Sequence, residues 1–441
     1  MKWRESLVGA RGQTVRVART VVVESARIPR KLFKVFVEVE GMYRNMVEQL
    51  TIYAVRNTIT SFTRLKALKY RELRRLYPKL PSHYAYTACQ DSSTRAKSFI
   101  RLKKLGQIDS DYPRVEKVSI WLDDHLWRLE GYTSIKIATH KGWIRIEFEP
   151  HKQYWKYING GWKPASEAKI KLDKRNKKIK IYLVLIKDIE PYKPRGYIPV
   201  DVNEDNIAIL VDDKPVLLET NMKKITLGYY YRRKRVQEKY DKIYGVKSRV
   251  KKKILRKLRE KKKKHSIRWK TANIIVREAV RRGYGIALEQ LGRRSANNMI
   301  KKVRDRQLRH RIYQASFKSI QNAIAEKARE YGVPVIYVDP RNTSRQCPIH
   351  RAPILYDNGS RIGKCSIGGE FWHRDVVACY NILSRTLGVD GSYAPKPLGI
   401  TVDGRPVPLA STAAHDPIVL DRGLWERWKS PPKIHKYRMT R

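Results

Sequence analysis

Acidic side chains, cysteines and long apolar runs are scarce in this chain of 441 residues. Asp and Glu number 42 against 95 Lys and Arg, which gives a formal net charge of +53. Four cysteines are too few for a secreted disulfide scaffold. No apolar stretch approaches the roughly 18 residues that a membrane span needs, and neither a signal-type apolar run nor a lipidation motif is present. These absences predict a cytoplasmic protein with no membrane partner.

The chain is nevertheless rich in the residues that build a folded core. Hydrophobic residues make up 41% of it and aromatic residues 10%, which excludes a disordered basic tail, because disordered chains are poor in aromatics. At roughly 150 residues per domain, the length predicts about three units. A charge of +53 repels itself in a compact state unless a polyanion neutralises it. Nucleic acid, contacted over a long footprint, is therefore the predicted partner.

Residue periodicity predicts a β-rich N-terminal unit that a helical stretch interrupts. Alternating apolar residues in 168–186 predict a hairpin that turns at 174–177. We assign residues 1–40 and 112–195 to a small β-barrel and residues 41–111 to a helical insertion, because apolar residues recur at helical spacing from about residue 42. The pattern alone does not choose a ligand for this unit.

The following part of the chain predicts an α/β domain. Three short apolar runs in 198–219 predict an antiparallel meander, and residues 232–282 form a strongly basic helical segment. Between residues 232 and 270 this segment carries 20 Lys and Arg and only three acids. A strand, a helix and a strand are then predicted at 283–291, 320–330 and 333–340. This is the element order of an RNase H-like α/β domain, although fold order alone does not give function.

Three carboxylates lie where a charge is costly. Asp201 stands inside the apolar run IPVDV, Glu289 inside IALEQL, and Asp375 in WHRDVVACYNIL. A buried charge needs compensation, and carboxylates from separate elements of one α/β unit fit a shared metal site better than three unrelated structural acids. Two divalent ions that cleave a phosphodiester need such a cluster, and magnesium prefers these hard oxygen ligands. Asp339 is a weaker candidate, and a turn before Pro340 explains it better.

Two cysteines and a histidine have the spacing of a zinc knuckle. Cys347 and His350 lie in TSRQCPIH, and Cys365 follows in GKCSIGGEFWHRD. The spacing places the fourth ligand at Gly368, which has no side chain to donate. Three possibilities stay open: His373 is the fourth ligand, the ion has three protein ligands and a water, or the site has lost its metal. The alternative is that Cys347 and Cys365 are buried thiols that bind no metal.

Four segments in a fixed order carry a resemblance to a known family. They are DVNEDN around Asp201, IALEQL around Glu289, TSRQCPIH at 343–350, and HRDVVACYNIL around Asp375. With them the chain resembles, over residues 1–388, the TnpB (OrfB) family of transposon-encoded RNA-guided nucleases, relatives of the type V CRISPR effectors.

The resemblance implies roles for particular residues of this chain. Asp201, Glu289 and Asp375 match the catalytic RuvC-like triad, which holds two magnesium ions. Cys347, His350 and Cys365 match the zinc-knuckle positions. The chain departs from the family at His350 and at Gly368, where the family commonly has cysteine, and these departures put the zinc in doubt but leave the triad intact.

The resemblance also implies a domain order. It identifies the predicted β-barrel as a wedge-like barrel with a helical recognition insertion. An RNase H-like (RuvC) nuclease domain with an inserted zinc knuckle follows it. The implied boundaries are 196–342 for the first nuclease part, 343–370 for the knuckle, 371–388 for the last nuclease motif and 389–441 for a basic, Pro-containing tail.

The implied activity is magnesium-dependent, RNA-guided cleavage of double-stranded DNA beside a short adjacent motif. The guide RNA comes from the transposon end, and the protein works in a prokaryotic cytoplasm in association with the nucleoid. Two alternatives stay open: an RNA-guided DNA-binding repressor that has lost cutting, and a transposase that acts on transposon ends. Intact Asp201, Glu289 and Asp375 favour the nuclease over the repressor.

Overall fold

The computed structural model describes residues 14–388 and 397, apart from 247, 293–294, 302, 316 and 358–359. The chain divides into two compact units, which we call the N-terminal unit (Arg16–Asp188) and the C-terminal unit (from Ile189 onward). The tail predicted at 389–441 lies outside the described residues, except for residue 397. Within the described part, no helix has the length and apolar character that crossing a membrane requires.

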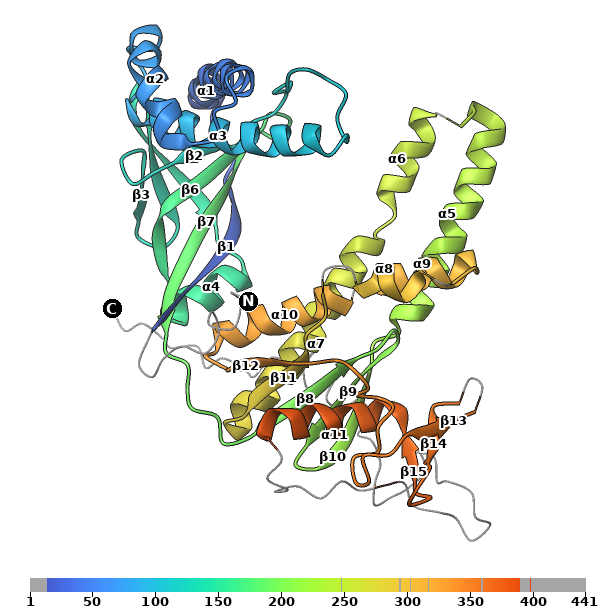
Figure 1. Ribbon diagram of the computed structural model, residues 1–441. Helices are drawn as coiled ribbons and strands as arrows, with labels where there is room; N and C mark the ends of the chain where they lie inside the picture. Colours follow the sequence, from blue (N-terminus) through green and yellow to red (C-terminus); the bar gives the residue numbers. More distant parts are fainter. Residues whose placement is uncertain are drawn as a thin grey trace. The chain divides into compact units, whose positions relative to one another are not determined.

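The N-terminal unit is built on a seven-stranded sheet with the strand order β2-β6-β7-β1-β5-β4-β3, which curls into a nearly closed barrel (Figure 1). Asp173 of β6 pairs with Lys178 of β7, so the predicted hairpin and its turn at 174–177 are confirmed. The strands are β1 (Val15–Ser25), β2 (Ile120–Leu122), β3 (Trp127–Glu130), β4 (Ser134–Thr139), β5 (Gly142–Glu149), β6 (Lys163–Asp173) and β7 (Lys178–Ile189).

Three helices are inserted between β1 and β2, and a short fourth helix precedes β6. They are α1 (Arg30–Arg56), α2 (Phe62–Leu76), α3 (His83–Lys104) and α4 (Lys152–Asn159). Helix α1 begins at Arg30, ahead of residue 41, where the pattern predicts the helical stretch to begin. The sequence KLFKVFVEVE alternates like a strand. However, Phe36, Val39 and Tyr43 recur at helical spacing and are fully buried, so core packing stabilises a helix here.

The C-terminal unit contains a five-stranded sheet with the order β10-β9-β8-β11-β12. Strands β8, β9 and β10 form the predicted antiparallel meander, whereas β11 runs parallel to both β8 and β12. The order of strands and helices along the chain is the predicted one. The strands are β8 (Tyr197–Val202), β9 (Asn206–Val211), β10 (Lys214–Glu219), β11 (Gly285–Glu289) and β12 (Val335–Val338).

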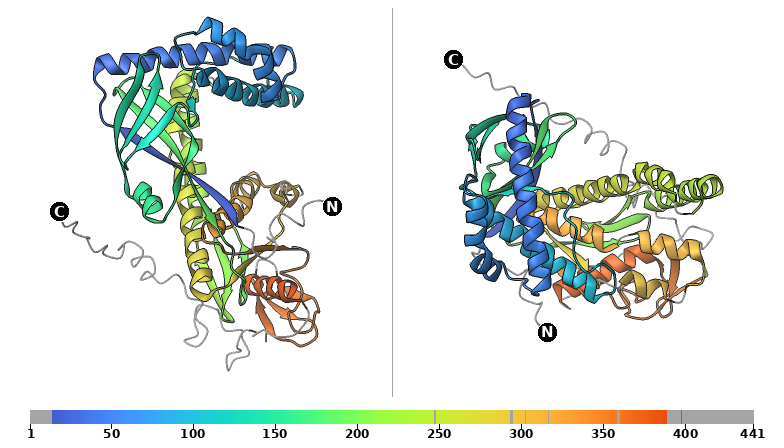
Figure 2. Two further views of the ribbon diagram at one scale, coloured as in Figure 1. Left: turned by 90° about the vertical axis from the view of Figure 1, so that its left-hand side faces the viewer. Right: turned by 90° about the horizontal axis from the view of Figure 1, so that it is seen from above.

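Helices cover both faces of this sheet (Figure 2). Helices α7 (Glu260–Arg282) and α10 (Phe317–Glu330) pack on one face, where Ile275 and Ile324 are buried against Val200 and Leu288. Helix α11 (Arg374–Leu387) packs on the other face through Val377 and Tyr380, in a separate core with Ala208. Gly283 ends α7, and its φ of 67° is a left-handed conformation that glycine adopts without strain.

The remaining elements extend from this α/β core. The basic helices predicted at 232–282 are α5 (Met222–Tyr244), α6 (Arg249–Lys257) and α7, and the first of them begins ten residues earlier than predicted. Gly245, with a positive φ, follows the last residue of α5, and Leu258 follows the last residue of α6. Two short helices, α8 (Ser295–Ile300) and α9 (Arg306–Ala315), precede α10. A small antiparallel sheet of β13 (Ile354–Tyr356), β14 (Ile362–Cys365) and β15 (Phe371–His373) precedes α11.

Candidate active site and cysteine cluster

Strand register places Asp201 beside Glu289. Val200 of β8 is paired with Leu288 of β11 in parallel register, so the next residues on the two strands are Asp201 and Glu289. Successive side chains of a strand point to opposite faces. Val200 and Leu288 enter the core under α7 and α10, so Asp201 and Glu289 point to the face that α11 covers. Ala208, the antiparallel partner of Asp201, also belongs to the α11 core.

Helix α11 contributes the third carboxylate to the same face. Asp375 lies in the first turn of α11, where the helix dipole favours a negative charge, and it is 1% exposed. Its charge and that of Glu289 both act on Asp201, which is 8% exposed. The structure therefore brings the three sequence-predicted acids together, although they are 88 and 86 residues apart in the sequence.

The electrostatics of this carboxylate cluster are unfavourable without a cation. Burial raises the pKa of Asp201 well above its usual range, and the charges of Glu289 and Asp375 raise it further. Burial also raises the pKa of Glu289. A like charge close by disfavours ionisation, and a divalent cation among the carboxylates removes that penalty.

Neighbouring polar side chains orient two of the acids. The Asn203 side-chain amide donates to Oδ2 of Asp201 over 2.7 Å, and the Thr343 hydroxyl donates to Oε1 of Glu289 over 2.6 Å. Asn381 of α11 donates to the carbonyl of Thr343 over 2.7 Å and thereby holds that loop. Sequence reasoning did not assign these residues a role, although Asn203, Thr343 and Asn381 all lie in the segments that identify the site.

Two further charged residues define the edge of the cluster. Arg361, whose side chain is 48% exposed, forms an ion pair with the buried carboxylate of Asp375. Asp339, the weaker fourth candidate, instead accepts a 3.0 Å hydrogen bond from the backbone N–H of Arg341. Asp339 is thus the turn residue that its position before Pro340 predicts.

The three predicted zinc ligands also come together. Cys347 and Cys365 are buried, and their Sγ atoms lie 3.8 Å and 3.6 Å from Nδ1 of His350. In a tetrahedral zinc site with Zn–S of about 2.3 Å and Zn–N of about 2.0–2.1 Å, sulfur and nitrogen ligands lie about 3.5 Å apart. The observed distances match that spacing.

Glu370 supplies the fourth donor that the sequence spacing lacks. Its Oε1 lies 3.3 Å from Nδ1 of His350, and one donor atom from each of Cys347, His350, Cys365 and Glu370 lies within 4.8 Å of the others. Oε2 of Glu370 is buried without a hydrogen-bond partner. This orphaned oxygen is consistent with a carboxylate that binds a cation.

Gly368 leaves the space that the carboxylate of Glu370 occupies. A Cβ atom at Gly368 would lie 2.2 Å from Oε1 of Glu370 and 2.2 Å from Cε1 of His350. A side chain at position 368 and the carboxylate of Glu370 therefore exclude each other. His373, considered above for the fourth position, precedes α11 outside this cluster.

The basic helices α5–α7 hold their few acids in ion pairs. Asp241 pairs with Lys251, and Glu238 lies 3.8 Å from Lys234. Glu260 pairs with Lys264 over 2.7 Å, and both side chains are 4% exposed. Exposed tyrosines stand among the cations of α5, including Tyr231 and Tyr244 at 49% and 57% exposure. Cations with interleaved aromatics match the phosphates and bases of nucleic acid.

Two family models match parts of the chain. Residues 317–382, which contain the cysteine cluster and most of α11, match the Cas12f1-like TNB domain. Residues 39–138 in the N-terminal unit match the Uncharacterized protein MJ0013 family.

Individual proteins cover more of the chain. TnpB-like protein MJ0751 of Methanocaldococcus jannaschii is 29% identical over 289 residues, which cover 62% of this chain and 97% of that protein. Uncharacterized protein MJ0857 of the same organism is 28% identical over 248 residues, which cover 52% of this chain and 90% of that protein.

A solved structure shares the fold. The protein of the Cas12f1–sgRNA–target DNA complex, solved by cryo-EM, aligns with a TM-score of 0.55 at 16% identity, covering 80% of this chain and 83% of that chain. The multidomain α/β fold, with its nearly closed barrel, is thus similar to that of a Cas12f effector. Together with the TNB-domain match and the similarity to a TnpB-like protein, this fold identifies the chain as a relative of the TnpB family.

Proposed function

We propose that this protein is an RNA-guided DNA endonuclease with an RNase H-like (RuvC) centre formed by Asp201, Glu289 and Asp375. The observation that carries the proposal is the meeting of buried Asp201, half-buried Glu289 and buried Asp375 between the β8–β11 sheet and α11, where burial and the charges of Glu289 and Asp375 raise the pKa of Asp201. Kinship with the TnpB family supports a nuclease function.

The carboxylate cluster fits divalent cations, because its charges are buried together with too little positive compensation. Asp201, Glu289 and Asp375 would hold two magnesium ions. When bound, these ions would supply activation of the attacking water and charge stabilisation of the leaving 3′ oxygen of a phosphodiester. Asn203 and Thr343 orient the carboxylates of Asp201 and Glu289 through their hydrogen bonds.

The contacts of the same residues favour a metal-binding cluster over a purely structural one. A structural ion pair satisfies a buried carboxylate with one fixed cation, as Arg361 does for Asp375. Asp201 instead accepts a neutral amide donor and faces two further carboxylates. Such an arrangement costs stability unless cations complete it.

The cysteine cluster is proposed as a zinc knuckle with Cys347, His350, Cys365 and Glu370 as ligands. Four protein ligands close a structural zinc site, so its role is to hold the β13–β15 sheet and the TSRQ loop against α11. This cluster is separate from the magnesium-binding carboxylates.

Guide RNA and double-stranded DNA are the proposed partners. The basic helices α5–α7 and their exposed tyrosines supply phosphate contacts and base stacking. Base pairing with an RNA derived from the transposon end then reads the target sequence, while the protein recognises backbone, A-form shape and a short adjacent motif. The repressor and the transposase are the competing functions.

The first test is the nucleic acid that accompanies the inactive protein. We would express the Asp375→Ala variant with its flanking transposon DNA, purify it in moderate salt and sequence the bound nucleic acid. One discrete RNA, with a constant scaffold that runs into variable flanking sequence, is expected. A heterogeneous mixture, or DNA ends without RNA, would overturn RNA guidance and favour the transposase.

The second test uses that RNA in a cleavage assay. The wild-type protein is expected to cut matched double-stranded DNA in magnesium, and Asp201→Ala and Asp375→Ala to bind RNA equally well but lose about a thousandfold or more in cleavage rate. Asp339→Asn, at the nearby turn, is the matched control and keeps wild-type activity. Binding without any cutting by the wild-type protein favours the repressor.

A further inference from the structure

A second group of metal-ligating side chains lies in the N-terminal unit, apart from the carboxylates and cysteines of the C-terminal unit. His83 is the first residue of α3, whereas Asp123 and His125 lie in the loop between β2 and β3. One donor atom from each of these three residues lies within 4.8 Å of the other two. The cluster thus joins the inserted helices to the barrel sheet.

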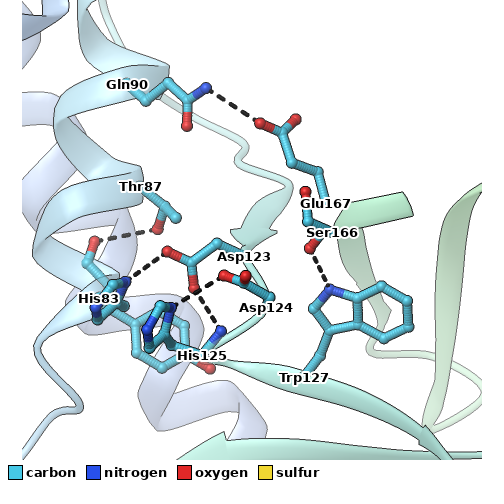
Figure 3. A network of polar contacts seen from close by, with 10 residues as sticks. His83, Thr87, Gln90, Asp123, Asp124, His125, Trp127, Ser166 and Glu167 are labelled. Carbon is cyan, nitrogen blue, oxygen red and sulfur yellow. Dashed lines mark hydrogen bonds and ion pairs between the residues drawn. The ribbon is translucent and has the colours of Figure 1, made fainter. Parts of the chain in front are cut away.

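The two imidazole rings stack and turn their Nδ1 edges toward the loop carboxylates (Figure 3). The ring centroids of His83 and His125 are 3.8 Å apart with an interplanar angle of 14°. Nδ1 of His83 lies 2.6 Å from Oδ2 of Asp123, and Nδ1 of His125 lies 3.0 Å from Oδ1 of Asp124. The structure thus brings two imidazole rings and the carboxylate of Asp123 together, with Asp124 at their side on His125.

Among the described residues, no lysine or arginine forms an ion pair with either of these carboxylates. The chain contains 95 Lys and Arg, yet within its described part the ion pairs of Asp123 and Asp124 are with His83 and His125. A divalent ion among these donors would supply the positive charge that lysine and arginine do not provide here.

We propose that His83, His125 and Asp123, with Asp124 beside them, bind one zinc-type divalent transition-metal ion. Imidazole nitrogens with carboxylate oxygens suit Zn²⁺ and its first-row neighbours, whereas Mg²⁺ and Ca²⁺ prefer ligand sets made only of oxygen. Zinc ligands stand about 2.0–2.2 Å from the ion, which modest rotations of these side chains allow.

The position of the site determines what the ion does. Asp123 is 15% exposed at its side chain, whereas His125 is 62% exposed, so the ion sits at the surface, where solvent can reach it. It fastens the first residue of α3 to the β2–β3 loop. The orientation of the inserted helices relative to the barrel then depends on metal, a role that does not require the carboxylate centre or the cysteine cluster.

The test measures the zinc that the full-length chain retains. Untagged protein, freed of nucleic acid in high salt and stripped with a chelator, is incubated with ZnCl₂, desalted and analysed by mass spectrometry for metal content. His125→Ala is expected to retain one zinc per chain fewer than the wild type. His265→Ala, which removes an exposed histidine from α7, is the matched control and retains the wild-type amount.

The difference between variants keeps this site distinct from the cysteine cluster, whose occupancy is the same in both proteins. Equal zinc in His125→Ala and wild type overturns the proposal, as does zinc that is retained only while the buffer contains free zinc. Cobalt gives a second readout, because sulfur-to-cobalt charge transfer arises only at the cysteines. In His125→Ala we expect the thiolate band to stay and the weaker bands of a nitrogen–oxygen site to disappear. Loss of both bands would indicate misfolding, and His83→Asn would then replace His125→Ala in the same comparison.

Discussion

The hydroxyl of Thr343 donates a 2.6 Å hydrogen bond to Oε1 of Glu289, which joins the loop after β12 to the end of β11. Asn381 of α11 donates to the carbonyl of Thr343, so the helix that contributes Asp375 also holds the residue that orients Glu289. The hydrogen bond acts against the burial that raises the pKa of Glu289. Thr343 is thus a positioning residue for the carboxylate centre.

Removal of this hydroxyl is expected to slow cleavage through Glu289. Thr343→Val keeps the shape of the side chain but leaves Glu289 without its donor, so the pKa of Glu289 rises further. We expect about a tenfold loss of cleavage rate at neutral pH. The acidic limb of the pH–rate profile should move to higher pH, because more alkaline conditions are then needed to ionise the carboxylate.

Thr343→Ser is the matched control, because it restores the hydroxyl, and it should recover most of the rate and the original profile. A Thr343→Val variant that loses rate but keeps the wild-type pH profile would contradict a role through Glu289. That outcome would point to a general loosening of the loop.

Asp201 is expected to destabilise the metal-free fold at neutral pH. The pKa of Asp201 is raised above its ordinary value of 3.8. Below pH 3.8 the carboxyl is protonated in both the folded and the unfolded chain, so its ionisation does not change the free energy of unfolding. The loss of folding stability grows as the pH rises above 3.8, because the carboxyl ionises freely in the unfolded chain but not in the folded one. Asp201→Asn should therefore unfold at a higher temperature than the wild type at pH 7 in chelator.

Thermal unfolding from pH 4 to pH 8 measures this difference. The advantage of Asp201→Asn should shrink toward acidic pH, and Mg²⁺ should raise the unfolding temperature of the wild type but not of the variant. A pH-independent advantage would mean that the amide merely packs better. An equal response of the two proteins to Mg²⁺ would mean that Asp201 does not hold the ion.

The sequence predicted most of the C-terminal sheet because its pattern is local. Each strand is a short apolar run, and each acid interrupts one, so Asp201 and Glu289 could be identified without knowledge of their neighbours. The order of elements followed from the same runs. What the runs could not give was the register, which places Asp201 and Glu289 on adjacent strands and on the face opposite Val200.

Residues outside a spacing rule were missed. Glu370 lies in the segment IGGEF, and only the folded loop shows that its carboxylate fills the space left by Gly368. His83 and His125 come from distant segments of the N-terminal unit, so no motif connects them. Helix α1 was predicted to begin too late, because KVFVEVE alternates like a strand while its burial follows the helical period.

Glu370 is expected to be needed for zinc at the cysteine cluster. Glu370→Gln keeps the size of the side chain but removes the charge, so zinc binds more weakly and the unfolding temperature falls toward that of the chelated protein. Cys347→Ser should have the same effect through loss of a thiolate. Cys89→Ser removes a buried thiol from α3 instead and serves as the control, with its zinc content unchanged.

Cobalt substitution makes this prediction specific to the cluster. The thiolate charge-transfer band should be present in the wild type and shifted in Glu370→Gln. It should be lost in the double variant that carries both Cys347→Ser and Cys365→Ser. An unaltered band in Glu370→Gln would show that the carboxylate is not a ligand. Water or another group would then complete the site.

The exposed lysines at the start of α7 are expected to contact phosphates of the guide RNA. Lys261, Lys262 and Lys263 are exposed, while their neighbour Glu260 is committed to Lys264. Each phosphate contact releases condensed counterions, so a plot of log affinity against log salt concentration has a slope proportional to the number of contacts. Replacing all three lysines by glutamine should reduce that slope by about 2 for single-stranded RNA. Lys214→Gln, which removes an exposed cation from β10, is the control and should leave the slope unchanged. Equal slopes for the wild type, the triple variant and Lys214→Gln would mean that the RNA does not contact these lysines.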